Sequence, residues 1–511
     1  MPESRLTTND QLSHIAIIGG GTAGWMAAAA LSRILGQETV AITLVESEEI
    51  GTIGVGEATI PPIQAFNNLL GIDEDEFVRE TKGTFKLGIE FLDWWRLGHR
   101  YFPPFGVYGI DFGPVPFEGL WHRLRLEGGA EPLDRYSICA TAAAAGRFMR
   151  PQTGGNTPLS HIGYAYHFDA GLYAGFLRRQ AEAAGVSRRE GRVVEVCLDG
   201  EQGLIEAVQL ADDSRIEADL FIDCSGFRGL LIAEALGAGF EDWGQWLPND
   251  RAVAVPSANV GPPTPFTRSS ARAAGWQWRI PLQHRTGNGY VYSSRHVSDD
   301  EAAATLLSHL DGEALAEPRL LRFQTGRRAA FWVKNCVALG LASGFMEPLE
   351  STSIHLVQAG IARLLEMLPT RRFEPADIRR YNRLMTAEFE SIRDFLILHF
   401  HANERDDTPY WRELGAMAVP EALQERMRIY AATGRIFREA DDLFTKTSWL
   451  AVMEGQGLRA QSYDPLASAM PLEEARARLA RIATVTAAAV PHMPTHADFI
   501  ARNCAAAVAS P

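Results

Sequence analysis

The spacing of apolar and polar residues predicts a β-α-β unit near the start of the chain. A short apolar run over 14–18 is typical of a buried strand, the alanine-rich stretch 22–35 of a helix, and residues 40–45 of a second strand. The first ten residues are polar, and we expect them to lie loosely beside the folded body. Closely spaced glycines separate the first strand from the helix, as a tight turn requires.

Later segments extend this pattern into a mixed α/β chain. Over 85–91 apolar residues alternate with more polar ones, which predicts a strand with Lys86 on its less apolar face. Over 354–368 apolar residues recur on one helical face until Pro369 ends the run. The other predicted elements are a strand pair at 191–196 and 205–210, a strand at 219–224, a connection at 261–265, and helices at 376–450 and 471–505.

The segments are expected to interleave into one body, because neither an internal repeat nor a low-complexity linker divides the 511 residues. The sequence predicts a sheet-rich part over 10–370, with insertions around 85–150 and 240–310, and a helical part over 371–511. The predicted fold class is therefore α/β, with a Rossmann-like sheet domain interleaved with a largely helical part.

Composition places the chain among ordinary soluble globular proteins, with 46% hydrophobic and 22% charged residues. Acidic residues outnumber basic ones by 63 to 49, and the net charge of -14 argues against nucleic acid or an anionic membrane as a partner. Five widely spaced cysteines without a CxxC pair predict neither a metal site nor a disulfide framework. Without an apolar signal core or a membrane-length apolar run, we expect a cytoplasmic protein.

The glycine turn after the first predicted strand has the form of a dinucleotide-binding loop. It matches GxGxxG, it precedes a helix, and an acidic residue follows about 20 residues later at the end of the second strand. Glycines allow the backbone to approach a pyrophosphate, which the helix N-terminus attracts, while the acid binds ribose hydroxyls. An unliganded glycine-rich turn is the alternative. The residues expected to contact the dinucleotide are Gly19, Gly21, Thr22, Ala23, Gly24 and Glu46.

Two later segments favour FAD over NAD as the dinucleotide. Residues 219–228 and 337–348 each combine a predicted strand with a turn, and flavin enzymes of the aromatic-hydroxylase type close their cofactor site with such segments. The sequence holds no second GxGxxG, so we expect no nicotinamide site. The flavin would then be reduced by a separate flavin reductase.

Two tryptophans one residue apart carry the most specific information in the chain. Residues 276–281 read Trp-Gln-Trp-Arg-Ile-Pro, which resembles the WxWxIP signature of the flavin-dependent halogenases, the tryptophan halogenase family. The glycine-dense loop 51–61, the segment around Lys86 and the segment 347–352 match that family too, in the same order along the chain. Without these matches, paired tryptophans would as readily anchor a strand in a core.

The resemblance implies FADH2- and O2-dependent halogenation of an electron-rich aromatic. In this family hypohalous acid forms inside the protein and crosses a tunnel to a lysine, which Lys86 matches. The lysine either hydrogen-bonds the oxidant or becomes a haloamine, and a carboxylate matched by Glu350 acts beside it. A lysine on the polar side of a strand would otherwise be a surface residue. Ser351 or Thr352 would cap the following helix, which is compatible with a halide site at the same helix end.

Further residues are assigned by this resemblance alone. The halide is expected at Thr352 and Ser353, and the family usually has glycine at the second of these positions, so bromide is hypothesised to be preferred over chloride. Further expected flavin contacts are Gly56, Glu57, Ala58, Val194, Leu341 and Ile354. Expected substrate or tunnel residues are Trp276, Trp278, Phe105, Pro348 and Trp449.

The substrate is less well defined by the sequence than the reaction. Family members that act on free tryptophan commonly show His-x-Phe, where this chain has Pro103-Pro104-Phe105. Residues 447–457 also lack the Tyr-Tyr and acidic pattern with which those enzymes bind the amino acid. We therefore expect indole, or a larger indole- or pyrrole-containing compound, ahead of free tryptophan.

Two other functions are compatible with the flavin-binding pattern. A flavin monooxygenase shares the dinucleotide fold but has no need of Lys86, Glu350 or the tryptophan pair. A non-catalytic FAD-binding protein would keep the fold without any product. The apolar positions of the C-terminal helices would serve core packing or a homodimer surface equally well.

Overall fold

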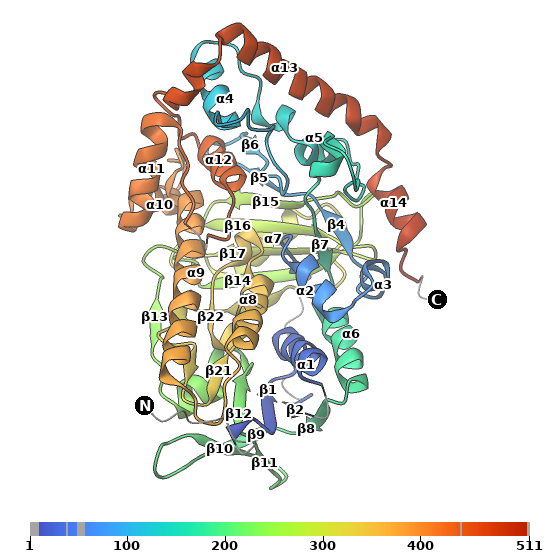
Figure 1. Ribbon diagram of the computed structural model, residues 1–511, viewed down its shortest axis with the longest axis vertical. Helices are drawn as coiled ribbons and strands as arrows, with labels where there is room; N and C mark the ends of the chain where they lie inside the picture. Colours follow the sequence, from blue (N-terminus) through green and yellow to red (C-terminus); the bar gives the residue numbers. More distant parts are fainter. Residues whose placement is uncertain (1–9, 37–38, 49–56, 440–441, 508–511) are drawn as a thin grey trace.

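A six-stranded sheet forms one end of the molecule (lower part of Figure 1), in the order β20-β21-β12-β1-β2-β8. The computed structural model describes residues 10–36, 39–48, 57–439 and 442–507. β1 lies between β2 and β12 and is parallel to both. The bounds are β1 (His14–Ile18), β2 (Ala41–Glu46), β8 (Ser187–Glu190), β12 (Leu220–Asp223), β20 (Trp332–Val333) and β21 (Cys336–Ala338).

The predicted β-α-β unit is confirmed. The first strand and the helix have the predicted bounds, and the second strand starts one residue later than predicted. β1 and β12 are buried almost throughout because α1 (Thr22–Leu35) and α8 (Ser353–Glu366) cover one face of the sheet, while a second core cluster fills the other. The expectation about the first ten residues falls on 1–9, outside the described part of the chain.

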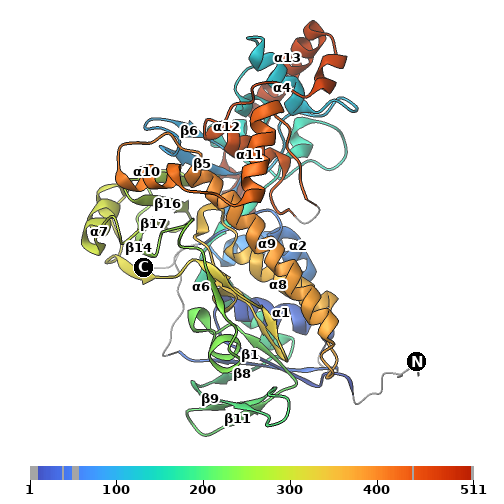
Figure 2. The same ribbon diagram turned by 90° about the vertical axis from the view of Figure 1, so that its left-hand side faces the viewer.

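A small antiparallel sheet lies below the six-stranded sheet (Figure 2). It consists of β9 (Val193–Leu198), β10 (Ile205–Leu210) and β11 (Arg215–Glu217), which confirms the predicted pair. Leu210, Val208 and Ile205 pack into the core cluster below the six-stranded sheet, while much of β9 is exposed. Two other three-stranded sheets contain β3 (Glu57–Ala58), β7 (Ala165–Phe168) and β4 (Thr84–Lys86), and β13 (Phe240–Asp242), β19 (Gly326–Arg328) and β22 (Gly344–Phe345).

The largest sheet lies in the middle of the molecule and has seven strands, in the order β18-β14-β17-β16-β15-β5-β6. All neighbours are antiparallel except β15 and β5. The predicted connection at 261–265 joins β14 to β15 without a regular element. The bounds are β5 (Ile89–Leu92), β6 (Arg100–Tyr101), β14 (Arg251–Ser257), β15 (Thr267–Arg272), β16 (Gly275–Pro281), β17 (Thr286–Tyr292) and β18 (Arg319–Arg322).

The predicted strand over 85–91 is two strands in two different sheets. β4 ends at Lys86 and pairs with β7, whereas β5 begins at Ile89 and pairs with β15 and β6. The chain passes from one sheet to the other at Gly88, where an added Cβ would lie 2.4 Å from the Pro103 carbonyl oxygen. The alternation of apolar residues had suggested an inner and an outer face, but both faces are covered.

Helices form the other end of the molecule and the edge that joins it to the sheets. α9 extends from the six-stranded sheet toward α10, α11 and α12 (Figure 2), and α13 lies across α4 and α5 at the top of Figure 1. The predicted helix 471–505 is two helices, because Pro491 cannot continue the first. The bounds are α4 (Phe117–Leu126), α5 (Ile138–Ala144), α9 (Pro375–His401), α10 (Pro409–Ala416), α11 (Glu421–Thr433), α12 (Lys446–Gly455), α13 (Leu472–Ala489) and α14 (His496–Asn503). The remaining helices are α2 (Ile63–Leu70), α3 (Glu74–Glu80), α6 (Ala170–Ala183) and α7 (Asp299–Ser308).

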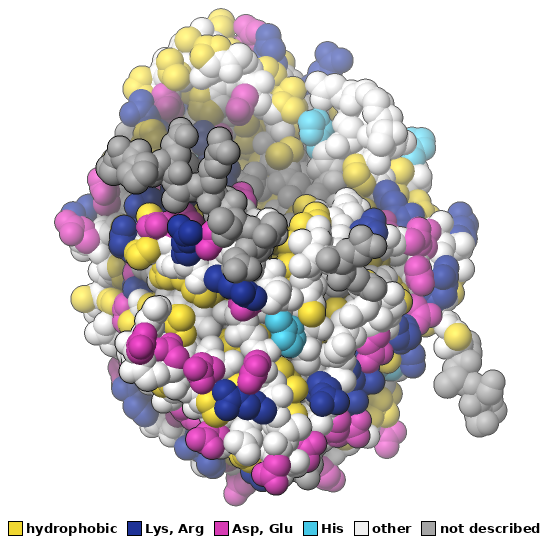
Figure 3. Space-filling model, turned by 60° about the horizontal axis from the view of Figure 1, so that its bottom comes forward, with side chains coloured by type: hydrophobic (Ala, Val, Ile, Leu, Met, Phe, Trp, Pro, Cys, Tyr) yellow, Lys and Arg dark blue, Asp and Glu magenta, His cyan; other side chains and the backbone are white. Residues whose placement is uncertain are grey.

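One contiguous hydrophobic core runs from the six-stranded sheet into the helical end, as expected for interleaved segments. The α/β fold class is confirmed, whereas the predicted boundary at residue 370 stays a prediction. Among the described residues, no helix combines the length and the apolarity that crossing a membrane requires. On the face drawn in Figure 3, basic and acidic side chains lie intermingled, so no concentrated positive surface forms there.

Candidate active site

The GxGxxG turn connects β1 to α1 with very little space around its glycines. Gly19 has φ +118°, and a Cβ there would lie 2.2 Å from the Cys224 carbonyl oxygen. A Cβ on Gly24 would lie 1.9 Å from the Gly19 carbonyl oxygen. The helix that follows has Gly21 as its N-cap, with no side-chain cap and no acidic residue in its first turn. Its first backbone N–H groups are therefore free to bind an anion such as a pyrophosphate.

Glu46 lies at the end of β2, beside this turn. Its carboxylate accepts a hydrogen bond from Trp25 Nε1 at 3.2 Å and forms ion pairs with Arg188 and, at 3.4 Å, Arg178. A Cβ on Gly20 would clash with the same carboxylate, so the turn and the acid are in direct contact. These contacts fix the orientation of Glu46. Because carboxylate oxygens can accept more than one hydrogen bond, Glu46 can still accept hydrogen bonds from ribose hydroxyls.

A second wall of this region comes from a distant part of the chain. Gly340, at the start of a short 3-10 helix (Gly340–Ala342), has φ +63°, and a Cβ there would lie 2.7 Å from the Ala23 Cβ. Leu341 follows directly, and Ile354 lies in the first turn of α8, which packs against α1. The structure thus brings the segments of Ala23, Leu341 and Ile354 together. A narrow, glycine-lined region at a helix N-terminus fits a flavin dinucleotide.

Two expected flavin contacts are not placed by these observations. Val194 lies on β9 in the small sheet, and its side chain is 53% exposed. Gly56 and the rest of the loop up to it lie outside the described residues. The described end of that loop, Glu57 and Ala58, forms β3, and burial raises the pKa of Glu57 to about 7, with the charge of Asp169 adding to the effect.

Lys86 is fully buried, so the interpretation as a surface lysine is wrong. Its Nζ donates hydrogen bonds to the Thr59 carbonyl oxygen at 3.0 Å and to Ser351 Oγ at 2.9 Å, and it lies 5.0 Å from the centre of the Phe105 ring. Burial lowers the pKa of Lys86 to about 7, although the charge of Glu350 acts in the opposite direction. Near neutral pH this side chain is therefore present as both ammonium and amine.

The segment that contacts Lys86 is a turn at the start of α8. Ser351 adopts the left-handed conformation, with φ +59°, and its hydroxyl accepts the hydrogen bond from Lys86. Thr352 is the N-cap of α8, yet its side chain accepts no hydrogen bond from the helix. The expectation that Ser351 or Thr352 caps the helix is thus confirmed for the position of Thr352, but the cap lacks a side-chain hydrogen bond. Backbone N–H groups at this helix end remain available to an anion such as a halide.

Glu350 is buried next to a histidine that sequence analysis does not single out. The Glu350 Oε1 and the His399 Nε2 lie 2.8 Å apart, although their alignment is not that of a hydrogen bond. The other ring nitrogen of His399 lies 3.0 Å from the Tyr101 hydroxyl. Phe91 stacks on His399 with ring centres 4.7 Å apart. The carboxylate is thus connected through an imidazole to a phenol.

Only weak signals in the sequence point to these two partners. His399 interrupts the apolar run 395–400 inside a long predicted helix, and Tyr101 lies close to the Pro-Pro-Phe segment. Neither residue belongs to a motif. Their contact with Glu350 depends on the packing of α9 against β6, which no local pattern predicts.

The tryptophan pair lies on β16 and faces a small pocket. Since residues alternate along a strand, Trp276 and Trp278 lie on the same face. The pocket has a volume of about 30 Å³, enough for one or two water-sized molecules but too small for an indole. It is lined by Glu57, Ala58, Thr267, Trp276, Trp278, Ile280, Pro348, Leu349, Ser351 and Ser353. One of these lining residues, Ser351, accepts the hydrogen bond from Lys86, so the pocket borders Lys86.

The two tryptophans differ in their hydrogen bonds. The indole N–H of Trp276 donates to Glu347, which also accepts from Asn249 at 2.9 Å, whereas the N–H of Trp278 has no partner among the described residues. Glu347 is fully buried, and burial raises its pKa to about 7 despite these two hydrogen bonds.

We expect Trp276→Phe to lower the free energy of unfolding by about 1–3 kcal/mol more than Trp278→Phe, because only the first change removes a partner of a buried carboxyl group. Urea unfolding of the two variants measures the difference. Trp278→Phe is the matched control, since both changes remove an indole from the same strand face. Equal losses of stability would contradict the role given to the Glu347 contact.

The expected substrate residues lie at different distances from Lys86. Phe105 is beside it, as the 5.0 Å separation shows. Trp449, on α12, is buried and packs on Phe395 with ring centres 4.8 Å apart, and Phe395 in turn packs on His399 at 5.3 Å. Trp449 is therefore joined to Glu350 through two intervening rings.

Among the described residues, no group of three His, Cys, Asp or Glu side chains is arranged to hold a metal ion.

The shifted titration of Lys86 predicts a pH effect on stability. A lysine in the unfolded chain has a pKa of about 10.4, so between about pH 7 and 10 the unfolded state binds a proton that the folded state lacks. The free energy of unfolding must then rise with pH in this window, by up to about 1.4 kcal/mol per pH unit from this group. Below about pH 7 both states are protonated and the effect ends.

We expect Lys86→Met to remove this rise. Urea unfolding at several pH values between about 7 and 10 gives the free energy of unfolding of the wild type and of the variant, and the difference between the two should grow with pH. A difference that stays constant with pH would mean that Lys86 keeps an ordinary pKa in the folded protein.

Comparison with known proteins gives consistent matches along the whole chain. A family model described as tryptophan halogenase matches residues 14–472. The chain is 37% identical over 497 residues to a tryptophan 7-halogenase from Lentzea aerocolonigenes, covering 90% of this chain and 92% of that protein. The solved structure of a flavin-dependent halogenase from Xanthomonas campestris has a TM-score of 0.94 and 48% identity, covering 98% of this chain and all of that one. Another flavin-dependent halogenase, from Brevundimonas sp. BAL3, has a TM-score of 0.93 and 47% identity, covering 96% of this chain and 99% of the other.

Proposed function

Because the chain belongs to the tryptophan halogenase family and is a flavin-dependent halogenase, we propose that it halogenates an electron-rich aromatic of the indole type, with FADH2, O2 and chloride or bromide. Bound reduced FAD, together with O2 and halide, supplies the oxidant as hypohalous acid. The observation that supports the chemistry best is the fully buried Lys86, held by Thr59 and Ser351 at the border of the small pocket.

Lys86 and Glu350 divide the proton transfers of the halogenation step. The Lys86 ammonium donates a hydrogen bond to the oxygen of hypohalous acid and passes its proton to it as water leaves. The halogen bonds to a ring carbon, and Glu350 accepts the proton that this carbon loses. Hypohalous acid and an aromatic C–H thus give a C–halogen bond and water. With the amine form of Lys86, the halogen would first bond to Nζ as water leaves; after its transfer to the ring, Glu350 would accept the ring proton and return it to Nζ, which restores the amine.

The tryptophan pair and the start of α8 serve the passage of the oxidant in this proposal. A pocket for one or two water-sized molecules admits hypohalous acid and excludes the aromatic substrate. Trp276 and Trp278 would then keep the substrate away from the flavin. Thr352 and Ser353 would hold the halide at the free helix N-terminus.

A separate flavin reductase is proposed to supply FADH2, because the sequence has one dinucleotide motif and no second one for a nicotinamide. A cytoplasmic location and a homodimer stay predictions.

The substrate is proposed to be indole or a larger compound that contains an indole or a pyrrole. The Lentzea relative is named for tryptophan. This chain keeps an aromatic ring beside Lys86, in Phe105, but has proline two residues before it in place of the histidine. Phe105 is placed to stack on an aromatic substrate.

Mass spectrometry of indole and free tryptophan, each incubated with the protein, FAD, a flavin reductase, NADH, O2 and bromide, tests the proposal. We expect the bromine isotope doublet in the product, with more product from indole than from tryptophan. A gain of one oxygen would instead identify a monooxygenase. FADH2 reoxidation without product across a broad aromatic panel would favour a non-catalytic FAD-binding protein.

Bromide is proposed to be preferred over chloride because Ser353 lines the small pocket where the family usually has glycine. With equimolar halides we expect mainly brominated product, and we expect Ser353→Gly to raise the chlorinated share. The ratio of the two isotope patterns measures both. Mainly chlorinated product from the wild-type protein would refute the preference.

A further inference from the structure

The strand that carries Lys86 lies at the edge of its sheet. β4 pairs with β7 in a sheet of the order β3-β7-β4, and among the described residues no strand pairs with it on the other side. Phe85, in the middle of β4, is fully buried. A buried backbone N–H group requires a hydrogen-bond partner, so the N–H of Phe85 needs one from outside the sheet.

That partner is His496, the first residue of α14, which lies beside β4 (right side of Figure 1). The Phe85 N–H donates a hydrogen bond to the His496 Nε2 at 3.1 Å, and the other ring nitrogen, Nδ1, lies 2.9 Å from the Pro263 carbonyl oxygen. Because a carbonyl oxygen only accepts and an N–H group only donates, the ring proton is assigned to Nδ1 and the lone pair to Nε2. Burial lowers the pKa of His496 to about 4, so the ring is neutral and keeps this lone pair at neutral pH.

The side chain of Phe85 packs against the same helix. Its ring meets that of Phe499 on α14 edge to face, with centres 5.2 Å apart, and stacks on Phe148 at 4.2 Å. Successive residues of a strand point to opposite faces, so these rings lie on the side of β4 away from the Lys86 side chain. α14 therefore holds both the backbone and the side chain of the residue next to the lysine.

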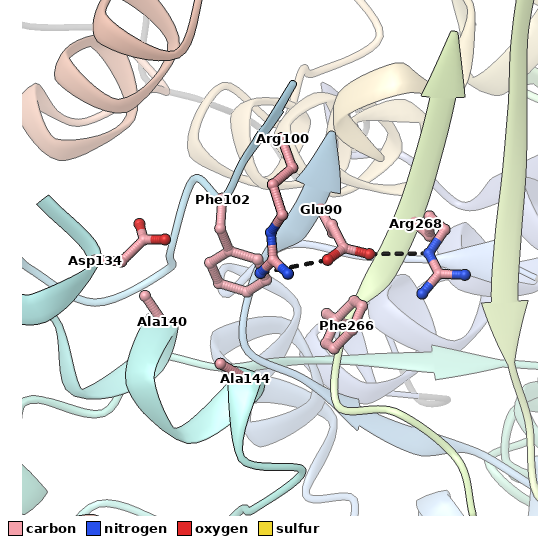
Figure 4. Close-up of a pocket in the computed structure, with 8 residues that line it drawn as sticks. All are labelled: Glu90, Arg100, Phe102, Asp134, Ala140, Ala144, Phe266 and Arg268. Atoms are coloured by element: carbon pink, nitrogen blue, oxygen red, sulfur yellow. Dashed lines mark hydrogen bonds and ion pairs between the residues drawn. The ribbon is translucent and has the colours of Figure 1, made fainter. Parts of the chain in front are cut away.

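The start of α14 is itself fixed by the segment that follows α5. α5 ends at Ala144, beside the cavity of about 220 Å³ drawn in Figure 4. Shortly after it, the Gly146 carbonyl oxygen accepts a hydrogen bond from the His496 backbone N–H at 2.9 Å. The Phe148 N–H donates to the Pro494 carbonyl oxygen at 3.3 Å. These two bonds set the position from which the imidazole reaches β4.

The end of the described chain is tied to the residue that precedes β4. The side-chain nitrogen of Gln283 donates to the Gly83 carbonyl oxygen at 2.7 Å and to the Cys504 carbonyl oxygen at 3.1 Å. The side-chain oxygen of the same residue accepts a hydrogen bond from the Ala506 N–H at 2.7 Å. Both ends of α14 are therefore connected to β4 or to its immediate neighbour.

We propose that His496 is a positioning residue for Lys86, acting through the backbone N–H of Phe85. By holding this short edge strand, it keeps the Lys86 Nζ within reach of Thr59 and Ser351. The match to the family model ends at residue 472, so His496 lies outside the stretch that contains the halogenase motifs. The proposal rests on the role proposed for Lys86 in halogenation.

Two amide variants of His496 test this role. In His496→Asn the side-chain amide lies near the position of Nδ1, so it can still donate to Pro263 but is too short to accept from Phe85. In His496→Gln the longer side chain places its amide oxygen near the position of Nε2, where it can accept from Phe85. The two variants thus differ mainly in the hydrogen bond to β4.

We expect His496→Asn to lower kcat for halogenation about tenfold or more, because a misplacement of a reacting group by about 1 Å can cost about 100-fold in rate. KM for the aromatic substrate and the affinity for FAD should stay unchanged, and His496→Gln should restore most of kcat. Hydrogen exchange followed by mass spectrometry gives a second readout. Deuterium uptake in a peptide covering 83–88 should be faster in His496→Asn than in the wild type, and close to the wild type in His496→Gln.

His492→Asn is the matched control, since it changes an exposed histidine in the 3-10 helix Val490–His492 just before α14 and should alter neither readout. If His496→Asn fails to fold, His496→Leu, which keeps apolar packing and removes both ring hydrogen bonds, takes its place with the same expected loss. A wild-type kcat in either variant, or an equal loss in His496→Gln, would overturn the proposal. Unchanged deuterium uptake would also overturn it, whereas a wild-type protein that forms no halogenated product would instead refute the proposed function.

Discussion

Replacement of Lys86 by alanine is expected to abolish halogenation while leaving FAD binding intact. The Lys86 Nζ donates a hydrogen bond to Ser351, which lines the passage that would carry the oxidant. Without it, hypohalous acid has no group to hold it or to protonate its leaving oxygen. We expect at least a 1,000-fold lower rate of product formation, on the order of the combined effect of a proton donor and an electrostatic contact.

The measurement is product formation by mass spectrometry, with flavin binding followed by fluorescence titration in the same samples. Lys86→Met separates loss of the amine from loss of volume, and it should be equally inactive. Lys334→Ala removes an exposed lysine that donates only to the Gly203 carbonyl oxygen, and it should keep full activity. If Lys86→Ala still halogenates one ring position selectively, the lysine is not the group that directs the oxidant.

Replacement of Glu350 by glutamine is expected to lower the rate of halogenation by about 100-fold or more, which is typical of the loss of a positioned general base. Glutamine keeps the size of the side chain beside His399 but cannot accept the ring proton. Loss of that proton should then limit the rate. A substrate deuterated at the halogenated carbon should therefore react more slowly than the protonated one in the variant, and much less so in the wild type.

The kinetic isotope effect distinguishes this role from a structural one, since a misfolded site would slow both isotopologues equally. Glu366→Gln changes an exposed glutamate at the end of the same helix, α8, and serves as the matched control. A Glu350→Gln enzyme that halogenates at the wild-type rate would show that another base removes the proton. His399, 2.8 Å from Glu350, would be the first candidate.

Sequence reasoning was most accurate where a short stretch determines its own structure. The turn at Gly19–Gly24 lies between a strand and a helix with the predicted bounds because glycine spacing and apolar runs are local properties. Reasoning from periodicity was wrong at 85–91, where a buried crossing between two sheets has the same alternation as a half-exposed strand. It was also wrong at 471–505, although Pro491 was a visible signal of the break.

The chemistry of the candidate site was only partly predictable from the sequence. Motifs indicated Lys86 and Glu350, but the burial of Lys86 depends on Thr59 and Ser351, which approach it from other segments of the chain. The His399–Tyr101 contact depends on side chains almost 300 positions apart. Such contacts arise from tertiary packing and leave no period or spacing to detect.

The 27-residue helix α9 constrains how this protein can be re-engineered. At 1.5 Å per residue it is about 40 Å long, and it begins near β20 and carries His399 in its last turn. An insertion or deletion of one residue within it would rotate everything beyond by about 100° and move the imidazole away from Glu350. Libraries meant to broaden the range of substrates should therefore vary the loops and helices after His401 and leave the length of α9 unchanged.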